Sequence, residues 1–129
     1  MQNPFSHVDL RVPDLEAGVA FYQTLLPEMG FSKYEGGQVF RSWTLPEGAG
    51  PRRPWFGITE DRAHQPNGNR IAFQVESRAE VDRIAALLEP ANARAISGPK
   101  SMPDYSPTYY AVFFEDPWGN PLEVLHWLD

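Results

Sequence analysis

A single carboxylate, that of Glu123, lies in an otherwise apolar run near the end of the sequence, with Leu122 and Val124 on either side. A charged side chain in a buried strand is costly unless it has a partner, so Glu123 could be a ligand or an acid–base group in a cavity. The alternative is an edge-strand glutamate that points to water. The surrounding residues are compatible with both interpretations.

The residues around Glu123 predict a β-hairpin. Residues 109–114 and 122–127 are rich in aromatic and β-branched side chains, and Asp-Pro-Trp-Gly-Asn at 116–120 separates them. Pro and Gly in a short segment between two such runs are typical of a tight turn. We therefore expect Glu123 on the second strand of this hairpin.

The two halves of the chain show the same order of periodic patterns. Polar and apolar side chains alternate over residues 5–12, which predicts a half-buried strand with His7 on its polar face. Apolar residues at helical spacing follow and predict an amphipathic helix over 15–26. The predicted elements are strands at 5–12, 31–34, 39–45 and 55–59 with this helix, then strands at 70–75, 94–96, 109–114 and 122–127 with a second helix between Ser77 and Pro90. Each half therefore reads strand, helix and three strands.

An internal duplication explains this repeated order. A shift of 63 residues places the first strand of the first half on that of the second half, and His7 on Arg70. A shift of 67 residues aligns the last strands and brings Phe56 opposite Glu123. If a pseudo-twofold axis relates the halves, we expect these four side chains to point to one place.

With these segments the sequence resembles the vicinal oxygen chelate superfamily, which includes glyoxalase I, bleomycin-resistance proteins, fosfomycin-resistance proteins and extradiol dioxygenases. The matching segments are His7-Val8, residues 70–75 and residues 110–124, where the last contains the 116–120 turn and Glu123. The resemblance is specific for the fold and unspecific for the reaction.

The resemblance implies an α+β fold of two paired βαβββ modules whose sheets curl around a cleft. The modules would span residues 5–60 and 69–127 and together form one domain over 5–127. Because many members of the superfamily are homodimers, it also implies a homodimer.

In metal-dependent members of the superfamily the first and last strands supply the ligands of a divalent ion, typically two histidines and a glutamate. His7 and Glu123 match ligand positions, Arg70 stands at the position of the second histidine, and Phe56 lies near that of a further glutamate in glyoxalase I. A guanidinium has no lone pair to offer and stays protonated. The two remaining ligands are fewer than the three of a facial triad. We therefore expect no cofactor and no metal; a divalent ion, if bound, would use His7 and Glu123.

Arg70 is then expected to replace the metal ion as the positive centre. We predict an ion pair between Arg70 and Glu123, with His7 close by, since an arginine and a carboxylate can pair in a fixed geometry. A second hypothesis is that Arg70 binds an anionic ligand and that Glu123 only orients the arginine. Tyr105, in a predicted Pro-rich loop over 98–108, is a candidate lid residue.

Composition restricts the partners. The 129 residues carry a net charge of −6, which argues against nucleic acid as a generic partner because there is no basic footprint. No apolar run approaches the ~20 residues of a membrane span. The chain has no cysteine, which excludes disulfides and zinc–thiolate sites. A cytoplasmic protein that binds a small molecule is expected.

Three classes of function fit these observations. The first is a metal-free, bleomycin-resistance-like binding protein of unassigned specificity, with His7, Phe56, Arg70, Glu123 and Tyr105 lining a cleft for a small anionic or aromatic molecule. The second is a lyase, isomerase or dioxygenase, either metal-dependent or, as a metal-free lyase or isomerase, with Glu123 or His7 as the catalytic base. The third is a structural or regulatory dimer.

Overall fold

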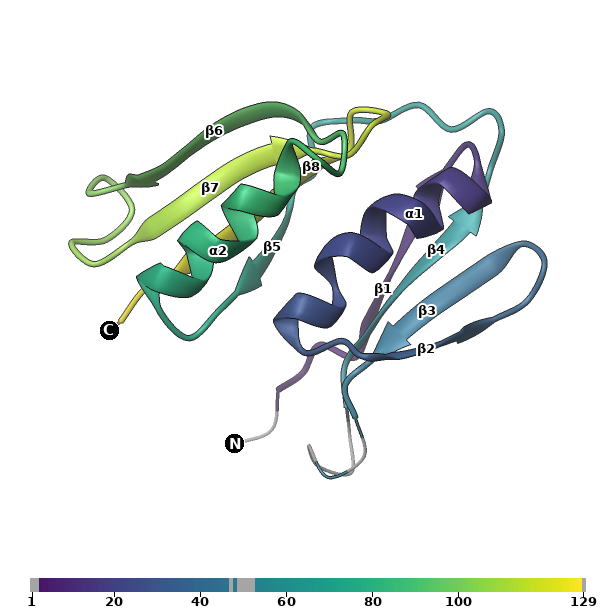
Figure 1. Cartoon of the computed structure of the whole chain (residues 1–129), viewed down its shortest axis with the longest axis horizontal. Coiled ribbons are helices and arrows are strands. Elements are labelled where there is room, and N and C mark those ends of the chain that lie inside the picture. Colours follow the sequence, from purple (N-terminus) through teal and green to yellow (C-terminus); the bar gives the residue numbers. More distant parts are fainter. Residues whose placement is uncertain (1–2, 47, 49–52, 129) are drawn as a thin grey trace. The chain divides into compact units, whose positions relative to one another are not determined.

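The computed structural model describes residues 3–46, 48 and 53–128. The chain divides into two compact units, Met1–His64 (unit 1) and Gln65–Asp129 (unit 2), which are described separately (Figure 1). The boundary falls in the segment between the two predicted repeats. Among the described residues, neither helix has the length and apolar character that crossing a membrane requires.

Both units have the order strand, helix, three strands, so the predicted repeat of βαβββ modules and the α+β class are confirmed. Unit 1 contains β1 (His7–Val12), α1 (Leu15–Leu25), a 3-10 turn η1 (Pro27–Met29), β2 (Lys33–Gly36), β3 (Phe40–Thr44) and β4 (Trp55–Glu60). Unit 2 contains β5 (Ile71–Gln74), α2 (Arg78–Leu88), β6 (Arg94–Ser101), β7 (Tyr110–Glu115) and β8 (Pro121–His126). The sheet orders are β1-β4-β3-β2 and β5-β8-β7-β6, and in each sheet the first strand pairs in parallel with the last.

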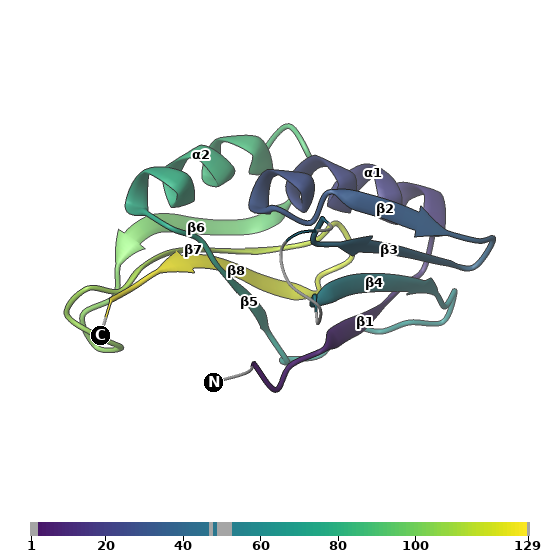
Figure 2. The same ribbon diagram turned by 90° about the horizontal axis from the view of Figure 1, so that it is seen from below.

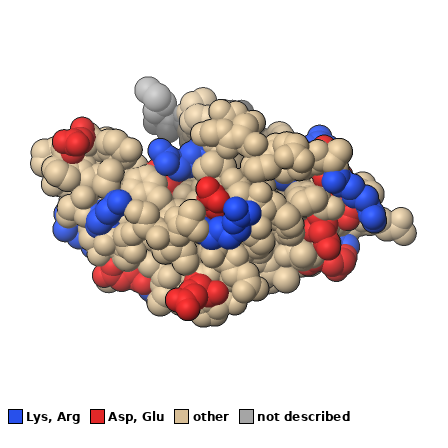
Figure 3. All heavy atoms as spheres, turned by 90° about the horizontal axis from the view of Figure 1, so that it is seen from above, with Lys and Arg blue, Asp and Glu red and all other residues tan. Residues whose placement is uncertain are grey.

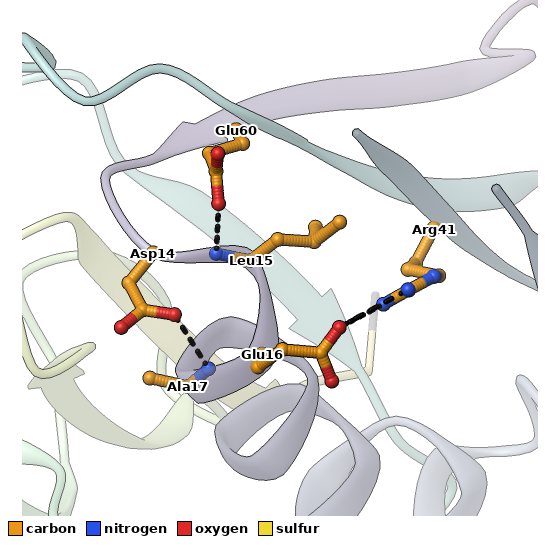
Figure 4. A network of polar contacts seen from close by, with 6 residues as sticks. All are labelled: Asp14, Leu15, Glu16, Ala17, Arg41 and Glu60. Atoms are coloured by element: carbon orange, nitrogen blue, oxygen red, sulfur yellow. Dashed lines mark hydrogen bonds and ion pairs between the residues drawn. The ribbon is translucent and has the colours of Figure 1, made fainter. Parts of the chain in front are cut away.

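Side-chain caps fix the start of each helix. The Asp14 carboxylate accepts a hydrogen bond from the Ala17 amide at 3.1 Å, and the Glu60 carboxylate of β4 accepts one from the Leu15 amide at 3.0 Å (Figure 4). In unit 2 the Ser77 hydroxyl accepts a hydrogen bond from the Glu80 amide at 3.1 Å. These acceptors satisfy amides that the first helical turn leaves without partners.

One face of each sheet packs on the helix of its own unit, and the opposite face is called here the helix-free face (Figure 2). In unit 1 the close approach requires Gly18, because a Cβ there would lie 2.9 Å from Ile58 Cδ1 and 3.1 Å from a Val12 methyl group. In unit 2 Val81, Ile84 and Leu88 of α2 are fully buried. Acidic and basic side chains are interspersed over the face drawn in Figure 3.

Strand β6 is longer than the sequence predicts. The predicted strand over 94–96 continues to Ser101, so the first part of the predicted 98–108 loop is strand. The pairing with β7 shifts register twice, and Ala95 and Gly98 have positive φ values of 51° and 101°. Gly98-Pro99 inside the segment suggested a break, but an edge strand with bulges tolerates both residue types.

Strand β1 is slightly shorter than predicted and begins at His7 rather than at residue 5. Most of the segment 46–53 between β3 and β4 lies outside the described residues.

Candidate functional site

The register of the parallel strands gives the correspondence between the two units. Val8 of β1 lies opposite Phe56 of β4, and Ile71 of β5 lies opposite Leu122 of β8. Because Val8 corresponds to Ile71, Phe56 corresponds to Leu122. The shift of 67 residues predicted from sequence for the last strands is therefore one residue too large.

This correction moves Phe56 away from the predicted site. Phe56 is 2% exposed and its ring lies 5.2 Å from that of Tyr22 in α1, so it belongs to the helix-covered core. A slip of one residue along a strand changes the face to which a side chain points. The position that corresponds to Glu123 is Gly57, and Trp55 lies on the helix-free face that Phe56 was expected to share.

Glu123 itself lies on the helix-free face of unit 2. On the other face, the Tyr110 hydroxyl donates to Asp82 of α2 at 2.6 Å, and His126 lies directly opposite Tyr110 in the register. Glu123 has the opposite parity to His126 along β8, so its side chain leaves the sheet on the side away from α2. His126 lies on the side of α2, and its ring Nδ1 lies 2.8 Å from the Val75 carbonyl oxygen.

The Glu123 carboxylate is buried and both of its oxygens have partners. The residue is 4% exposed, and β8 is a central strand between β5 and β7, so the interpretation as an edge-strand glutamate in water is wrong. Oε1 lies 3.5 Å from Arg70 Nε, and Oε2 accepts a hydrogen bond from the Tyr109 hydroxyl. The predicted ion pair between Arg70 and Glu123 is confirmed.

Arg70 combines this ion pair with an aromatic contact. Its side chain is 44% exposed, and its guanidinium carbon lies 5.0 Å from the centre of the Phe113 ring. Phe113 of β7 is the register partner of Glu123 in β8, so the arginine reaches from the edge of the sheet over its middle strands. A cation over an aromatic ring is stabilised without using its N–H donors.

Tyr109 is the site residue that sequence analysis missed. Burial, followed by the hydrogen bond to Glu123, raises the pKa of the Tyr109 phenol well above its ordinary value of 10.0, whereas the Arg70 charge opposes this shift. Tyr109 therefore keeps its proton at neutral pH and holds the carboxylate. Tyr109 is four residues before Phe113, so the two side chains share one face of the strand, and Phe113 lies opposite Glu123. This even spacing is the sequence signal that could have placed Tyr109 beside Glu123.

Tyr105 packs against this tyrosine from the loop that follows β6. The two rings meet edge-to-face with centroids 5.1 Å apart, and Tyr105 is 54% exposed. Its role as a lid stays a prediction.

His7 lies on the helix-free face of unit 1, in aromatic surroundings. Its ring stacks on Trp55, with centroids 4.1 Å apart and planes at 5°, and Nδ1 lies 3.0 Å from the Ser6 hydroxyl. The Phe40 ring meets Trp55 edge-to-face at 5.8 Å. That His7 lies close to Arg70 and Glu123 stays a prediction.

The donor set of unit 2 does not suit a divalent cation. The Glu123 oxygens already bind the Arg70 guanidinium and the Tyr109 hydroxyl, and Arg70 adds a fixed positive charge where a ligand would be needed. Across residues 3–46, 48 and 53–128, no three His, Asp or Glu side chains are grouped so that they could hold a metal ion.

Comparisons with known proteins agree on one family. The family model described as Glyoxalase/Bleomycin resistance protein/Dioxygenase superfamily matches residues 5–124. The uncharacterized protein YqjT of Bacillus subtilis strain 168 is 27% identical over 122 residues, which cover 86% of this chain and 89% of that protein.

Solved structures give the same result. A glyoxalase/bleomycin resistance protein from Albidiferax ferrireducens T118 is 27% identical with a TM-score of 0.74, and the match covers 96% of this chain and 98% of that one. A putative glyoxalase from Bacillus halodurans is 28% identical with a TM-score of 0.67, covering 97% and 96% of the two chains. The fosfomycin resistance protein FosX from Mesorhizobium loti, at 18% identity and a TM-score of 0.68 over 99% and 95% of the chains, shares the fold.

Proposed function

Because the chain belongs to the Glyoxalase/Bleomycin resistance protein/Dioxygenase superfamily, we propose that it binds a small organic anion without a metal ion. The binding site lies on the helix-free face of unit 2, and Arg70 is its anchor. Glu123 and Tyr109 position this anchor, and Phe113 and Tyr105 provide aromatic surface for the rest of the ligand.

The observation that carries this proposal is how little of the Arg70 guanidinium is used. Among the described residues, its ion-pair and ring contacts are the one through Nε to Glu123 and the one with the Phe113 ring. The terminal nitrogens remain as donors on a half-exposed side chain. A guanidinium offers two parallel N–H bonds to a carboxylate or phosphate group, so it recognises anions in a defined orientation.

Glu123 supports the anion site rather than opposing it. Its two oxygens have Arg70 Nε and the Tyr109 hydroxyl as partners, and its side chain is 5% exposed where that of Arg70 is 44% exposed. A buried carboxylate with two partners fixes the rotamer of the arginine, and this lowers the conformational cost of binding a ligand. The site is therefore organised before the anion arrives.

Calorimetry and thermal shift with small carboxylates test this proposal, using wild type, Arg70→Ala and a matched control, Arg62→Ala. The control removes an arginine whose Nε also lies 3.5 Å from a glutamate, Glu60, but in unit 1. Arg70→Ala should weaken benzoate binding about tenfold or more, because a charge-assisted contact is lost. Arg62→Ala should bind like the wild type.

Two results would contradict the proposal. Carboxylate binding that survives Arg70→Ala would remove Arg70 as the anchor. About one equivalent of Zn, Mn, Fe or Ni per chain in protein purified without chelator, measured by elemental analysis, would contradict the metal-free site.

A metal-free lyase or isomerase that uses Glu123 as a base is the second candidate. The burial of Glu123 beside a protonated Tyr109 favours it, since the pair holds a proton acceptor and a proton donor close together. This function needs Oε2 to leave the tyrosine hydroxyl when substrate binds. Turnover that disappears in Glu123→Gln, while ligand affinity is retained, would favour the enzyme over the binding protein.

We further propose that the protein acts as a homodimer in the cytoplasm. Homodimers are common in the family, and a chain without cysteine suits a reducing compartment. Light scattering should give twice the mass of one chain, and the mass of a single chain would contradict the dimer.

A further inference from the structure

The register shift between Ser97 and Lys100 of β6 places Lys100 on the face that carries Glu123. Ser97 lies opposite Phe113 and Lys100 opposite Ala111, so three steps along β6 match two steps along β7. An even number of steps keeps Phe113 and Ala111 on one face, and the extra residue in β6 turns Lys100 to the same side as Ser97. Without the bulge Lys100 would point to the face that packs on α2.

The ammonium group of Lys100 lies beside the Phe113 ring and donates to a hydroxyl group. Nζ is 5.8 Å from the centre of the Phe113 ring and donates to the Ser97 hydroxyl at 2.7 Å. In the part of the chain that the structure describes, no Asp or Glu forms an ion pair with it. Its charge is therefore not neutralised by a carboxylate of the sheet.

The two edge strands of this sheet thus send cations to one ring. Arg70 directly precedes β5 and Lys100 lies on β6, the two edges of the order β5-β8-β7-β6, and both contact Phe113 of β7. Glu123 supplies one negative charge against these two positive charges, and the other charged residues of β6 and β7 on this face, Arg94 and Glu115, form an ion pair with each other at 4.0 Å. The helix-free face of unit 2 has a local positive excess in a chain of net charge −6.

We propose that Arg70 and Lys100 form a two-point anion site across Phe113, which selects small dicarboxylates over monocarboxylates. This inference rests on the proposed function, because Arg70 is one of its two points. Arg70 takes one carboxylate through the guanidinium fork, and Lys100 takes the other as a point charge. Phe113 provides the apolar surface for the carbon chain between the two cations.

Matched ligands and variants test the contribution of Lys100 separately from that of Arg70. Glutarate and butyrate differ by one carboxylate, as do isophthalate and benzoate. Lys33 and Lys100 are the two lysines of the chain, so Lys33→Gln in unit 1 is a control with the same change in charge as Lys100→Gln. We expect each dicarboxylate to bind about fivefold tighter than its partner, the range of one exposed ion pair.

Lys100→Gln should remove this preference by lowering glutarate and isophthalate affinity more than butyrate and benzoate affinity, whereas Lys33→Gln should keep the preference. Reductive methylation with ¹³C-formaldehyde retains the charge of both lysines and labels them for NMR. Glutarate should shift the dimethyl-lysine signal that Lys100→Gln removes, and should leave that of Lys33 in place.

The outcomes separate the two proposals. Equal binding of dicarboxylates and monocarboxylates, with both dependent on Arg70, would overturn the two-point site and leave the anion site standing. A dicarboxylate preference that survives Lys100→Gln would also overturn it. Binding of neither class, or binding independent of Arg70, would contradict the proposed function itself.

Discussion

The helix-free faces of the two units have the same arrangement of strands and differ in their side chains. Asp9 lies opposite Gly57 in unit 1, and Ala72 lies opposite Glu123 at the corresponding place in unit 2. Where unit 2 has a buried carboxylate, unit 1 has no side chain. The Phe40 and Trp55 rings occupy the space above Gly57, and a Cβ there would lie 2.8 Å from each.

This difference shows what a carboxylate on such a face requires. Unit 2 supplies Arg70 and Tyr109 for the two oxygens of Glu123, and the site proposed for an anion follows from that set of partners. Unit 1 fills the equivalent volume with aromatic rings. At this one position a βαβββ module can therefore hold either aromatic rings or a buried carboxylate without any change in strand order.

The largest expected effect concerns the two neighbours Phe56 and Trp55, which point to opposite faces of β4. Phe56→Ala removes a fully buried ring and should lower the free energy of unfolding by about 3–5 kcal/mol. Trp55→Ala removes a half-buried ring on the helix-free face and should cost about 2 kcal/mol, because part of its surface is already in water. Urea denaturation of both variants measures the difference.

Equal losses for the two variants would contradict the assignment of their faces. The comparison is direct because both residues lie on the same strand. It also tests the corrected alignment, in which Phe56 corresponds to the core residue Leu122.

Gly57→Glu transplants the carboxylate of unit 2 into unit 1 and should be nearly as costly. The new side chain meets the Phe40 and Trp55 rings and brings a charge to a place without a cationic partner in register, so we expect a loss of about 3 kcal/mol. Gly57→Ala is the control that keeps the steric conflict and omits the charge, and it should cost about 1–2 kcal/mol. A stable Gly57→Glu protein would show that the face accepts a carboxylate without the partners of unit 2.

Much of the architecture could be predicted from the sequence because the alternation of polar and apolar residues in strands and the helical spacing of apolar residues are both local patterns. The spacing of apolar residues in α1 and α2, and the caps at Asp14 and Ser77, are set by residues a few positions apart. The ion pair between Arg70 and Glu123 was predicted from the family positions that these residues occupy, not from local pattern.

What escaped prediction depends on the hydrogen-bonded register. The correspondence of the last strands relied on similar residue types, which cannot fix register to one residue, and the error placed Phe56 on the wrong face. The bulges of β6 follow no periodicity, so the direction of Lys100 was not predictable. Tyr109 was assigned to the first strand of the predicted hairpin and not to the site, because its partner Glu123 lies on a different strand.

Arg70→Ala tests how far the charged face of unit 2 depends on its cation. Removing the arginine leaves the Glu123 charge buried with Tyr109 alone, and should cost about 1–2 kcal/mol, a buried-pair penalty reduced because Arg70 is half-exposed. Glu123→Gln in the same chain should restore most of this stability. Denaturation of the two single variants and the double variant gives the coupling energy, and purely additive losses would contradict a direct interaction.

Tyr109→Phe should have the smallest effect and gives a distinct dependence on pH. Loss of the hydrogen bond to Glu123 should cost about 1 kcal/mol near neutral pH. Because burial and Glu123 raise the pKa of Tyr109 in the folded state above the ordinary 10.0, the unfolded chain loses this proton first as the pH rises. The wild type should therefore lose stability above pH 10.0, over the range up to the folded pKa.

The slope of stability against pH above 10 should be shallower in Tyr109→Phe than in the wild type. Tyr110, whose pKa is raised by its hydrogen bond to Asp82, contributes a second slope, so Tyr110→Phe is the matched control on the helix-covered face. Denaturation between pH 8 and pH 11 separates the two tyrosines. If Tyr109→Phe leaves the slope of stability against pH above 10 unchanged, the Tyr109 hydroxyl does not donate to the Glu123 carboxylate. Arg70 would then be the partner that stabilises the Glu123 charge.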